Sequence, residues 1–229
     1  MTLVYPVIHY LDAQTTLDEA AIAFDCGADG IFLISHHGDD MDLLVLGKVI
    51  KARNGSKFVG INMLGLPFLR AHEYAQDMGL DGIWGDHVGV SSAGLNRVGY
   101  ELKQRMLQQQ DTQIQIFGSI AFKYQPIETR PVLAAQKAMD LGVIPTTSGS
   151  ATGCAPTLEK ISSMSAGVKG RLAVASGMTP ENIAVFAPYL SHVLVSTGVS
   201  SDPYHFDPLR LSSFVQIAHA AVPPNQGEN

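Results

Sequence analysis

Short apolar runs rich in Val and Ile recur along this chain at a spacing of roughly 20 to 30 residues, which is about the length of a strand plus a helix and its connections. The eight runs begin near Val4, Gly30, Lys57, Gly82, Gln113, Val143, Arg171 and His192. Each run is continuously apolar, as in parallel strands that are covered on both faces, whereas a half-exposed strand alternates. The sequence therefore predicts eight buried parallel strands.

The segments between these runs have the apolar periodicity of helices. In the first segment we expect Thr16 to be the N-cap, with Glu19 as its capping-box partner and Gly27 just past the end. Further helices are predicted near 41–54, 66–79, 95–110, 130–142, 157–168, 179–191 and 207–222. Four links from a helix to the next strand are alike, namely CGADGIFLIS, MGLDGIWGDH, MDLGVIPTTS and PYLSHVLVST. Such short turns are typical of the helix-to-strand connections in parallel sheets.

Eight strand-helix units joined by right-handed crossovers favour an α/β fold that closes into a (β/α)8 TIM barrel, over an open doubly wound sheet. The chain has 229 residues, of which 46% are hydrophobic and 16% charged. These values suit one globular domain of this class. We assign residues 1–222 to a single barrel and residues 223–229, PPNQGEN, to a polar C-terminal tail.

The charge distribution argues against nucleic acid as a partner. The formal net charge is −6, and no stretch gathers basic and aromatic side chains. No apolar stretch approaches the roughly 20 residues that cross a bilayer, and the first residues lack the basic start of a signal peptide. Cys26 and Cys154 form neither a CxxC pair nor a disulfide framework, which favours a cytoplasmic location. Association into a homo-oligomer stays open.

In a barrel of this class the active site lies at the carboxyl ends of the strands and in the loops that follow them. The polar residues at these positions are His9, Asp12, Ser35, His36, His37, Asp39, Asp40, Asn62, Asp86, His87, Lys123, Thr146, Thr147, Ser148, Ser176, Ser196 and Thr197. Their concentration at one end of the predicted barrel indicates a polar site there.

Two glycine turns follow the last two predicted strands. Ser176-Gly177 comes first, before a helix start with Thr179 as N-cap and a proline at the first helical position, and Ser196-Thr197-Gly198 follows at the next strand. Glycine lets backbone amides approach an anion closely, and loops after strands seven and eight are where such barrels hold phosphate. The turns predict a phosphate site made by Ser176, Gly177, Ser196, Thr197 and Gly198. The alternative is that each glycine serves only a tight turn.

Several motifs carry a resemblance to known families, namely VIHYLD, ADGIFLISHHGDD, GINMLGLP, FKYQPI, TSGSATG, SGMTPEN and VSTGVSSDP. With these motifs the chain resembles the BtpA/SgcQ family of predicted TIM-barrel proteins. Residues 176–215 are similar to the end of phosphoribosylanthranilate isomerase and other ribulose-phosphate-binding barrels. The resemblance implies a barrel of the ribulose-phosphate-binding type with a phosphate site. One branch of the BtpA/SgcQ family is tied to photosystem I biogenesis.

Three residues are candidates for catalysis. Asp86 precedes His87 at the end of the fourth strand, and because neighbouring strand residues point to opposite sides we expect Asp86 to face the interior. Lys123 ends the apolar stretch IQIFGSIAFK, where it would stabilise an oxyanion, contact phosphate or form a Schiff base. The alternative is a lysine that reaches solvent. Asp39 matches the Gly-Asp of the BtpA/SgcQ pattern.

Other residues are assigned to binding. His9 ends the first strand, and Asn62, which matches the asparagine after strand three in the family, would orient a sugar hydroxyl. The segment from His36 to Asp40 has side chains suited to a divalent metal, but its spacing is too compact to be diagnostic, and we favour a polar loop that caps the next helix. We therefore assign no metal ligands and expect no cofactor, while a divalent metal stays open.

The sequence supports three hypotheses of function. The first is an enzyme that acts on a sugar phosphate or nucleotide-like molecule by general acid/base chemistry, as an isomerase, lyase or (phospho)ribosyl transferase. The second is a non-catalytic assembly or biogenesis factor of the BtpA type. The third is a metal-dependent hydrolase that uses the loop from His36 to Asp40. No motif for nicotinamide or P-loop chemistry is present in the sequence.

Overall fold

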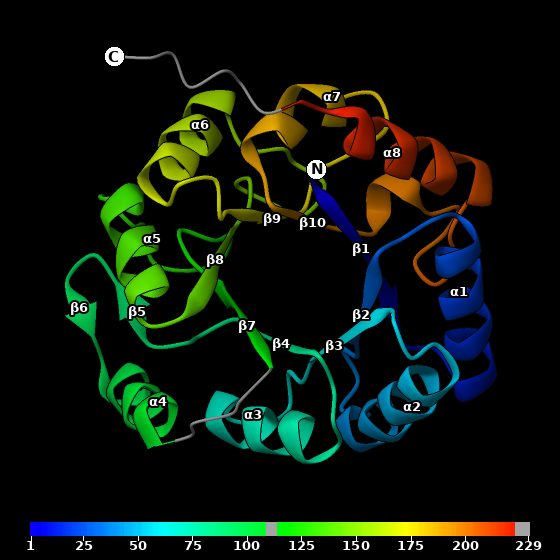
Figure 1. Cartoon of the computed structure of the whole chain (residues 1–229), viewed down its shortest axis with the longest axis horizontal. Coiled ribbons are helices and arrows are strands. Elements are labelled where there is room, and N and C mark those ends of the chain that lie inside the picture. Colours follow the sequence, from blue (N-terminus) through cyan, green and yellow to red (C-terminus); the bar gives the residue numbers. More distant parts are fainter. Residues whose placement is uncertain (109–113, 223–229) are drawn as a thin grey trace.

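A computed structural model describes residues 1–108 and 114–222 of the chain. In it, eight parallel strands close into a barrel in the order β1-β10-β9-β8-β7-β4-β3-β2. The strands are β1 Leu3–His9, β2 Gly30–Ile34, β3 Phe58–Asn62, β4 Gly82–Gly85, β7 Gln115–Ser119, β8 Val143–Thr147, β9 Ala173–Ala175 and β10 His192–Val195. Figure 1 looks into this ring of strands, with the helices around its outside. The predicted TIM barrel is confirmed.

The helices alternate with the strands along the chain. Their bounds are α1 Ala13–Asp25, α2 Asp40–Arg53, α3 Phe68–Asp77, α4 Arg97–Gln108, α5 Pro131–Asp140, α6 Leu158–Gly167, α7 Ile183–Phe186 and α8 Pro208–Ala220, with short 3-10 helices η1 Ala187–Tyr189 and η2 Thr197–Val199. A small hairpin of β5 Val90–Ser91 and β6 Gly94–Leu95, which the periodicity did not predict, follows β4. The predicted tail at 223–229 and the expected strand start at Gln113 lie outside the described residues. Among the described residues, no helix is both long and apolar enough to span a membrane.

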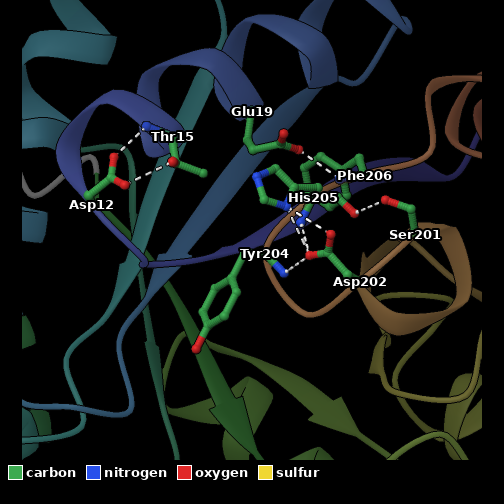
Figure 2. A network of polar contacts seen from close by, with 8 residues as sticks. All are labelled: Asp12, Thr15, Glu19, Ser201, Asp202, Tyr204, His205 and Phe206. Atoms are coloured by element: carbon green, nitrogen blue, oxygen red, sulfur yellow. Dashed lines mark hydrogen bonds and ion pairs between the residues drawn. The ribbon is translucent and has the colours of Figure 1, made fainter.

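The first helix begins four residues earlier than the sequence predicted. Asp12 is its N-cap, and the Asp12 carboxylate accepts hydrogen bonds from the Thr15 amide at 2.8 Å and the Thr15 hydroxyl at 3.1 Å (Figure 2). Thr16 lies inside the first turn, where its hydroxyl donates to the Asp12 carbonyl. The capping-box prediction for Thr16 and Glu19 is therefore wrong, because Asp12 supplies a better-placed acceptor. Gly27, at φ +90°, follows the helix end as predicted.

Glu19 instead holds a distant loop. Its carboxylate, buried in α1, accepts a hydrogen bond of 2.7 Å from the amide of Phe206, in the loop that connects η2 to α8 (Figure 2). In the same loop, Asp202 accepts from the amides of Tyr204 and His205 and pairs with the His205 ring at 2.9 Å. Burial raises the pKa of Glu19. These contacts fix the segment that follows the last glycine turn.

The barrel interior is filled mainly by aromatic rings. Tyr5 stacks on Phe58 with ring centroids 4.4 Å apart, and Phe32 meets Phe117 edge to face at 5.2 Å. Glycines on neighbouring strands make room for these rings, since a Cβ on Gly60 would overlap the Phe32 ring. The rings fill the barrel from the amino ends of the strands to its middle and leave the carboxyl end open.

Candidate functional site

A cavity of about 450 Å³ lies at the carboxyl ends of the strands, within the size range of small-molecule sites. The predicted site residues that line it are His9, Asn62, Asp86, Lys123, Ser176, Gly177, Ser196, Thr197 and Gly198. Of the residues assigned to catalysis or binding, Asp39 alone is not part of this lining. Other polar residues at the predicted strand ends also lie outside it, namely Asp12, Ser35, His37, Asp40, Thr146, Thr147 and Ser148. The rule that places active sites at the strand ends thus brings residues from across the whole chain into one cavity.

The alternation of side chains along each strand decides which residues face this cavity. Asn62 lies two residues after Gly60, whose missing Cβ makes room for the Phe32 ring inside the barrel. Asp86 likewise lies two residues after Trp84, whose side chain belongs to the interior aromatic cluster. Val7, Ile34, Trp84 and Leu194 form apolar parts of the lining below these polar groups. His87 lines the outer, exposed part of the mouth.

The two glycine turns after β9 and β10 pack against neighbouring loops. Gly177 has φ +74°, and a Cβ there would overlap the backbone of Cys154 and Ala155. A Cβ on Gly198 would overlap the carbonyl oxygen of Met178. Packing alone therefore requires glycine at both turns, as the alternative interpretation stated. Both turns nevertheless line the cavity, so their backbone groups can contact a ligand there.

The predicted helix start after β9 is wrong. Thr179 is not an N-cap, because α7 begins only at Ile183. Asn182 instead organises the turn: its side-chain oxygen accepts from the Thr179 amide at 2.9 Å, and its side-chain nitrogen donates to the Gly177 carbonyl at 2.8 Å. Together with η1, the short α7 replaces the helix that was expected over 179–191. Asn182 therefore fixes the shape of the first glycine turn.

Lys123 lies in a loop and not at a strand end, because β7 ends at Ser119. Its backbone amide donates to the Ser148 hydroxyl at 2.7 Å, and its ammonium donates to the Thr152 hydroxyl at 3.2 Å. Burial lowers the pKa of Lys123, while Tyr124 and Asp86 act in the opposite direction. Both contacts come from the loop that connects β8 to α6, which thus holds the backbone and the half-buried ammonium of Lys123 at the cavity.

Gln125 ties Asp86 to the loop that carries Lys123. Its side-chain nitrogen donates to the Asp86 carbonyl at 2.6 Å and to the Ser119 carbonyl at 3.1 Å, and its oxygen accepts from the Phe122 amide at 3.2 Å. Sequence reasoning missed Gln125, although it stands two residues after Lys123 in the motif FKYQPI. Sequence reasoning also missed three other residues of the lining, because only the folded loops bring them to the mouth of the cavity. They are Phe122, Tyr124 and Thr152.

Two histidines meet on one side of the cavity. The rings of His9 and His36 stack with centroids 5.2 Å apart, and both residues line the cavity. Burial is the largest cause that lowers the pKa of His9 to about 4, followed by the electrostatic effects of His36 and Lys123. The His9 imidazole is therefore neutral at neutral pH and is able to accept or donate one hydrogen bond.

Asn62 ends β3 and is the most deeply buried of the polar residues that line the cavity, with only 2% of its surface exposed. Its side-chain nitrogen has no hydrogen-bond partner in the described part of the chain. Because an unsatisfied buried donor is costly, this group calls for a ligand or water oxygen in the cavity.

The segment from His36 to Asp40 does not act as one unit. His36 faces the cavity, whereas the Asp39 carboxylate accepts from the Ser35 hydroxyl at 2.9 Å and Asp40 accepts from the Gly65 amide at 2.8 Å. Asp39 precedes α2 without a side-chain cap bond, so the predicted cap does not form. Across residues 1–108 and 114–222, no three His, Cys, Asp or Glu side chains gather in a metal-binding arrangement.

Comparison with protein-family models and with curated protein sequences finds no match. The resemblance to the BtpA/SgcQ family therefore stays a prediction. Solved structures do match. Thiamine phosphate pyrophosphorylase from Pyrococcus furiosus is 13% identical, with 95% of each chain covered and a TM-score of 0.64. Phosphoribosyl anthranilate isomerase from Thermotoga maritima is 15% identical, with 96% of this chain and 99% of that chain covered and a TM-score of 0.66. At these identities the likeness shows the fold alone.

Proposed function

We propose that this chain is an enzyme that binds a phosphorylated sugar or nucleotide-like molecule in the cavity and transforms it by general acid/base catalysis. The observation that carries the proposal is the convergence of two glycine turns, a half-buried lysine, a carboxylate and a neutral imidazole on one cavity at the strand ends. The reaction would be an isomerisation, a lyase reaction or a (phospho)ribosyl transfer.

The phosphate would be held at the turns after β9 and β10. Thr197 and Gly198 are the first residues of η2, so their amides have no partner within that helix. With the Gly177 amide and the hydroxyls of Ser196 and Thr197, they offer donors to a phosphate oxygen. The Ser176 hydroxyl accepts from the Gly153 amide and donates to the Ala151 carbonyl. The Ser176 hydroxyl therefore stabilises the turn and is already engaged in hydrogen bonds within the protein.

The remaining polar groups suit the chemistry. Lys123 would stabilise negative charge that develops on the substrate, and Asp86 would transfer a proton. His9 would bind the substrate as a neutral imidazole. Asp39 receives no role here, because its carboxylate is bound to Ser35 outside the cavity lining.

Structural neighbours support this choice of ligand. One matching structure, phosphoribosyl anthranilate isomerase in complex with reduced 1-(o-carboxyphenylamino)-1-deoxyribulose 5-phosphate, is 15% identical and covers 96% of this chain, with a TM-score of 0.62. That barrel thus binds a ribulose phosphate derivative. The cytoplasmic location, the homo-oligomer and the absence of a resident cofactor stay predictions from the sequence.

Ligand binding is tested by thermal shift with ribose 5-phosphate and with ribose as its control. A ligand at 100 times its dissociation constant adds about 2.7 kcal/mol to the free energy of unfolding. We expect ribose 5-phosphate, and not ribose, to raise the melting midpoint. Thr197→Asp should abolish the shift because its carboxylate repels phosphate, while the neutral isostere Thr197→Asn keeps it. Equal shifts for the two variants, or none with any phosphorylated compound, would overturn the proposal.

Catalysis is tested by proton exchange in deuterated water. Isomerases and lyases that use a general base exchange a carbon-bound proton of their substrate, which proton NMR follows in a panel of sugar phosphates that bind. We expect exchange with the wild type and its loss in Asp86→Asn with binding retained. Binding without exchange or turnover would instead favour a non-catalytic factor of the BtpA type.

A further inference from the structure

The charges around the cavity are few and nearly balanced. Among the described residues that line it, Lys123 is the only lysine or arginine, and Asp86 is the only carboxylate. The other titratable groups of the described lining are His9, His36, His87 and the phenol of Tyr124. His9 has its pKa lowered to about 4 by burial and therefore adds no charge near neutral pH. A ligand with several negative charges would find one lysine to offset them.

The strand order places these groups relative to one another. In the closed ring, β3 and β4 lie directly across from β9 and β10. Asn62 and Asp86, at the ends of β3 and β4, therefore face the two glycine turns across the mouth. Lys123 follows β7 on one flank, and His9 ends β1 on the other. The end of the cavity opposite the turns thus holds an amide, a carboxylate and the imidazole of His87, but no lysine or arginine of the described lining.

Asn62 indicates what that far end binds. Its buried side-chain nitrogen lacks a partner, so the complementary ligand group is an oxygen acceptor such as a carbonyl or hydroxyl. A ligand carboxylate there would lie near Asp86, whose charge already acts on Lys123, the one lysine of the described lining. A second negative group is therefore costly in this partly desolvated site. The apolar side chains of Ile34, Trp84 and Leu194 below would further disfavour a second charged group.

We infer that the ligand carries a single phosphate and an otherwise uncharged body, whose carbonyl or hydroxyl oxygen binds Asn62 at the end of the cavity remote from the glycine turns. This inference rests on the proposed function and narrows its substrate class. Sugar monophosphates fit it, whereas phosphorylated acids and bisphosphates do not.

The test compares matched ligand pairs by isothermal titration in metal-free buffer. The open-chain glucitol 6-phosphate is paired with 6-phosphogluconate, and glycerol 3-phosphate with 3-phosphoglycerate, so that in each pair a carboxylate replaces a terminal hydroxymethyl group. We expect the dissociation constant of the acid to be at least tenfold higher in each pair, a difference of about 1.4 kcal/mol. Equal or tighter binding of the acids would overturn the inference and leave the phosphate site intact.

A designed variant tests the role of charge through a gain in affinity for the phosphorylated acid. Leu64 lines the cavity two residues after Asn62, so Leu64→Arg adds a second cation to the lining, on the side of Asn62. We expect Leu64→Arg to tighten the binding of 6-phosphogluconate at least tenfold relative to glucitol 6-phosphate, whereas the uncharged control Leu64→Gln leaves the ratio of the two dissociation constants unchanged. No change of the ratio in Leu64→Arg would count against the inference.

Inorganic phosphate separates this inference from the proposed function. Asn62→Leu should weaken glucose 6-phosphate at least tenfold while the dissociation constant of inorganic phosphate stays the same. If Asn62→Leu affects neither ligand, Asn62 does not bind the body and the inference fails alone. If the wild type binds neither inorganic phosphate nor any sugar phosphate, the proposed function is wrong and the inference, which rests on it, is wrong as well.

Discussion

The two ends of the barrel are built in opposite ways. At the amino ends of the strands, aromatic rings fill the interior, with His192 packed against Tyr5 and Phe117 at centroid distances of 5.4 and 5.1 Å. At the carboxyl ends the barrel opens into a cavity of about 450 Å³. There the buried side-chain nitrogen of Asn62 has no partner among the described residues.

Hydrogen bonding differs in the same way. At the amino end the Asp29 carboxylate accepts from the Val4 amide at 2.8 Å and from His219 at 2.9 Å, and Asp81 accepts from the Val59 amide and from Lys51, each at 2.8 Å. These aspartates precede the repeated glycines of ADG and LDG, so the motif anchors one strand to the next. The amino end therefore stabilises the fold, and the carboxyl end is left for a ligand. The four predictions below test this division.

The largest effect is expected for Phe32→Ala. Phe32 is fully buried among the interior rings, and the cavity left by its ring should lower the free energy of unfolding by about 3–5 kcal/mol. Urea denaturation measures the change. Tyr124→Ala is the control, because Tyr124 is 79% exposed at the mouth and should change stability by less than about 0.5 kcal/mol. Similar losses for the two variants would contradict the division of roles.

Next in size is Asp29→Ala at the amino end. It leaves the Val4 amide without its acceptor, which should cost about 1–3 kcal/mol of unfolding free energy. Asp86→Ala is the matched removal of a carboxylate at the carboxyl end and should leave stability nearly unchanged while it impairs the proposed chemistry. Denaturant midpoints of the two variants decide between these outcomes, and a larger loss for Asp86→Ala would reverse the assignment.

Acid should destabilise the protein through one histidine at each end. Burial lowers the pKa of both His9 and His192 to about 4 from an ordinary value of 6.5. The unfolded state then binds more protons, so stability is full above pH 6.5 and is lost as the pH falls toward 4. Between pH 6.5 and 5.5 each histidine should account for about 1 kcal/mol.

Unfolding at the two pH values, in the wild type and in His9→Gln and His192→Gln, tests this dependence. Each variant should show a smaller loss between pH 6.5 and 5.5 than the wild type. Inorganic phosphate should shift the NMR titration of His9, which lines the cavity, and leave that of His192 unchanged. A phosphate effect on His192 alone would place the anion at the wrong end of the barrel.

The smallest effect is a gain of stability in Asn62→Leu. The substitution replaces a buried donor that has no partner among the described residues by an apolar side chain of similar size. This should raise the free energy of unfolding by up to about 1 kcal/mol. Thermal unfolding without ligand measures this gain. A loss of more than about 1 kcal/mol would mean that Asn62 has a structural role instead.

Much of the fold was predictable because the strands are continuous apolar runs that are buried on both faces. The helix ends were less predictable. Asp12 competed with Thr16 as the cap, and the turn built by Asn182 replaced the predicted helix start at Thr179. Both outcomes depend on which side-chain oxygen best reaches a free amide, and periodicity does not reveal this.

The candidate site was predictable in part for a topological reason. All parallel strands end at the same rim, so residues at strand ends share one cavity whatever their distance in the sequence. Asn62 and Asp86 followed from this rule. Gln125 and Thr152 did not, because they lie in loops whose course is set by contacts with other loops.

The sequence by itself thus determined the barrel, the rim that carries the polar groups and the two glycine turns, because hydrophobic periodicity and strand direction are local properties. Only the tertiary structure decided that Asp39 is bound to Ser35, that Lys123 reaches the cavity from a loop and that Asn62 is buried without a partner. These outcomes depend on which groups meet across the fold, since burial and hydrogen bonding are properties of the assembled neighbourhood.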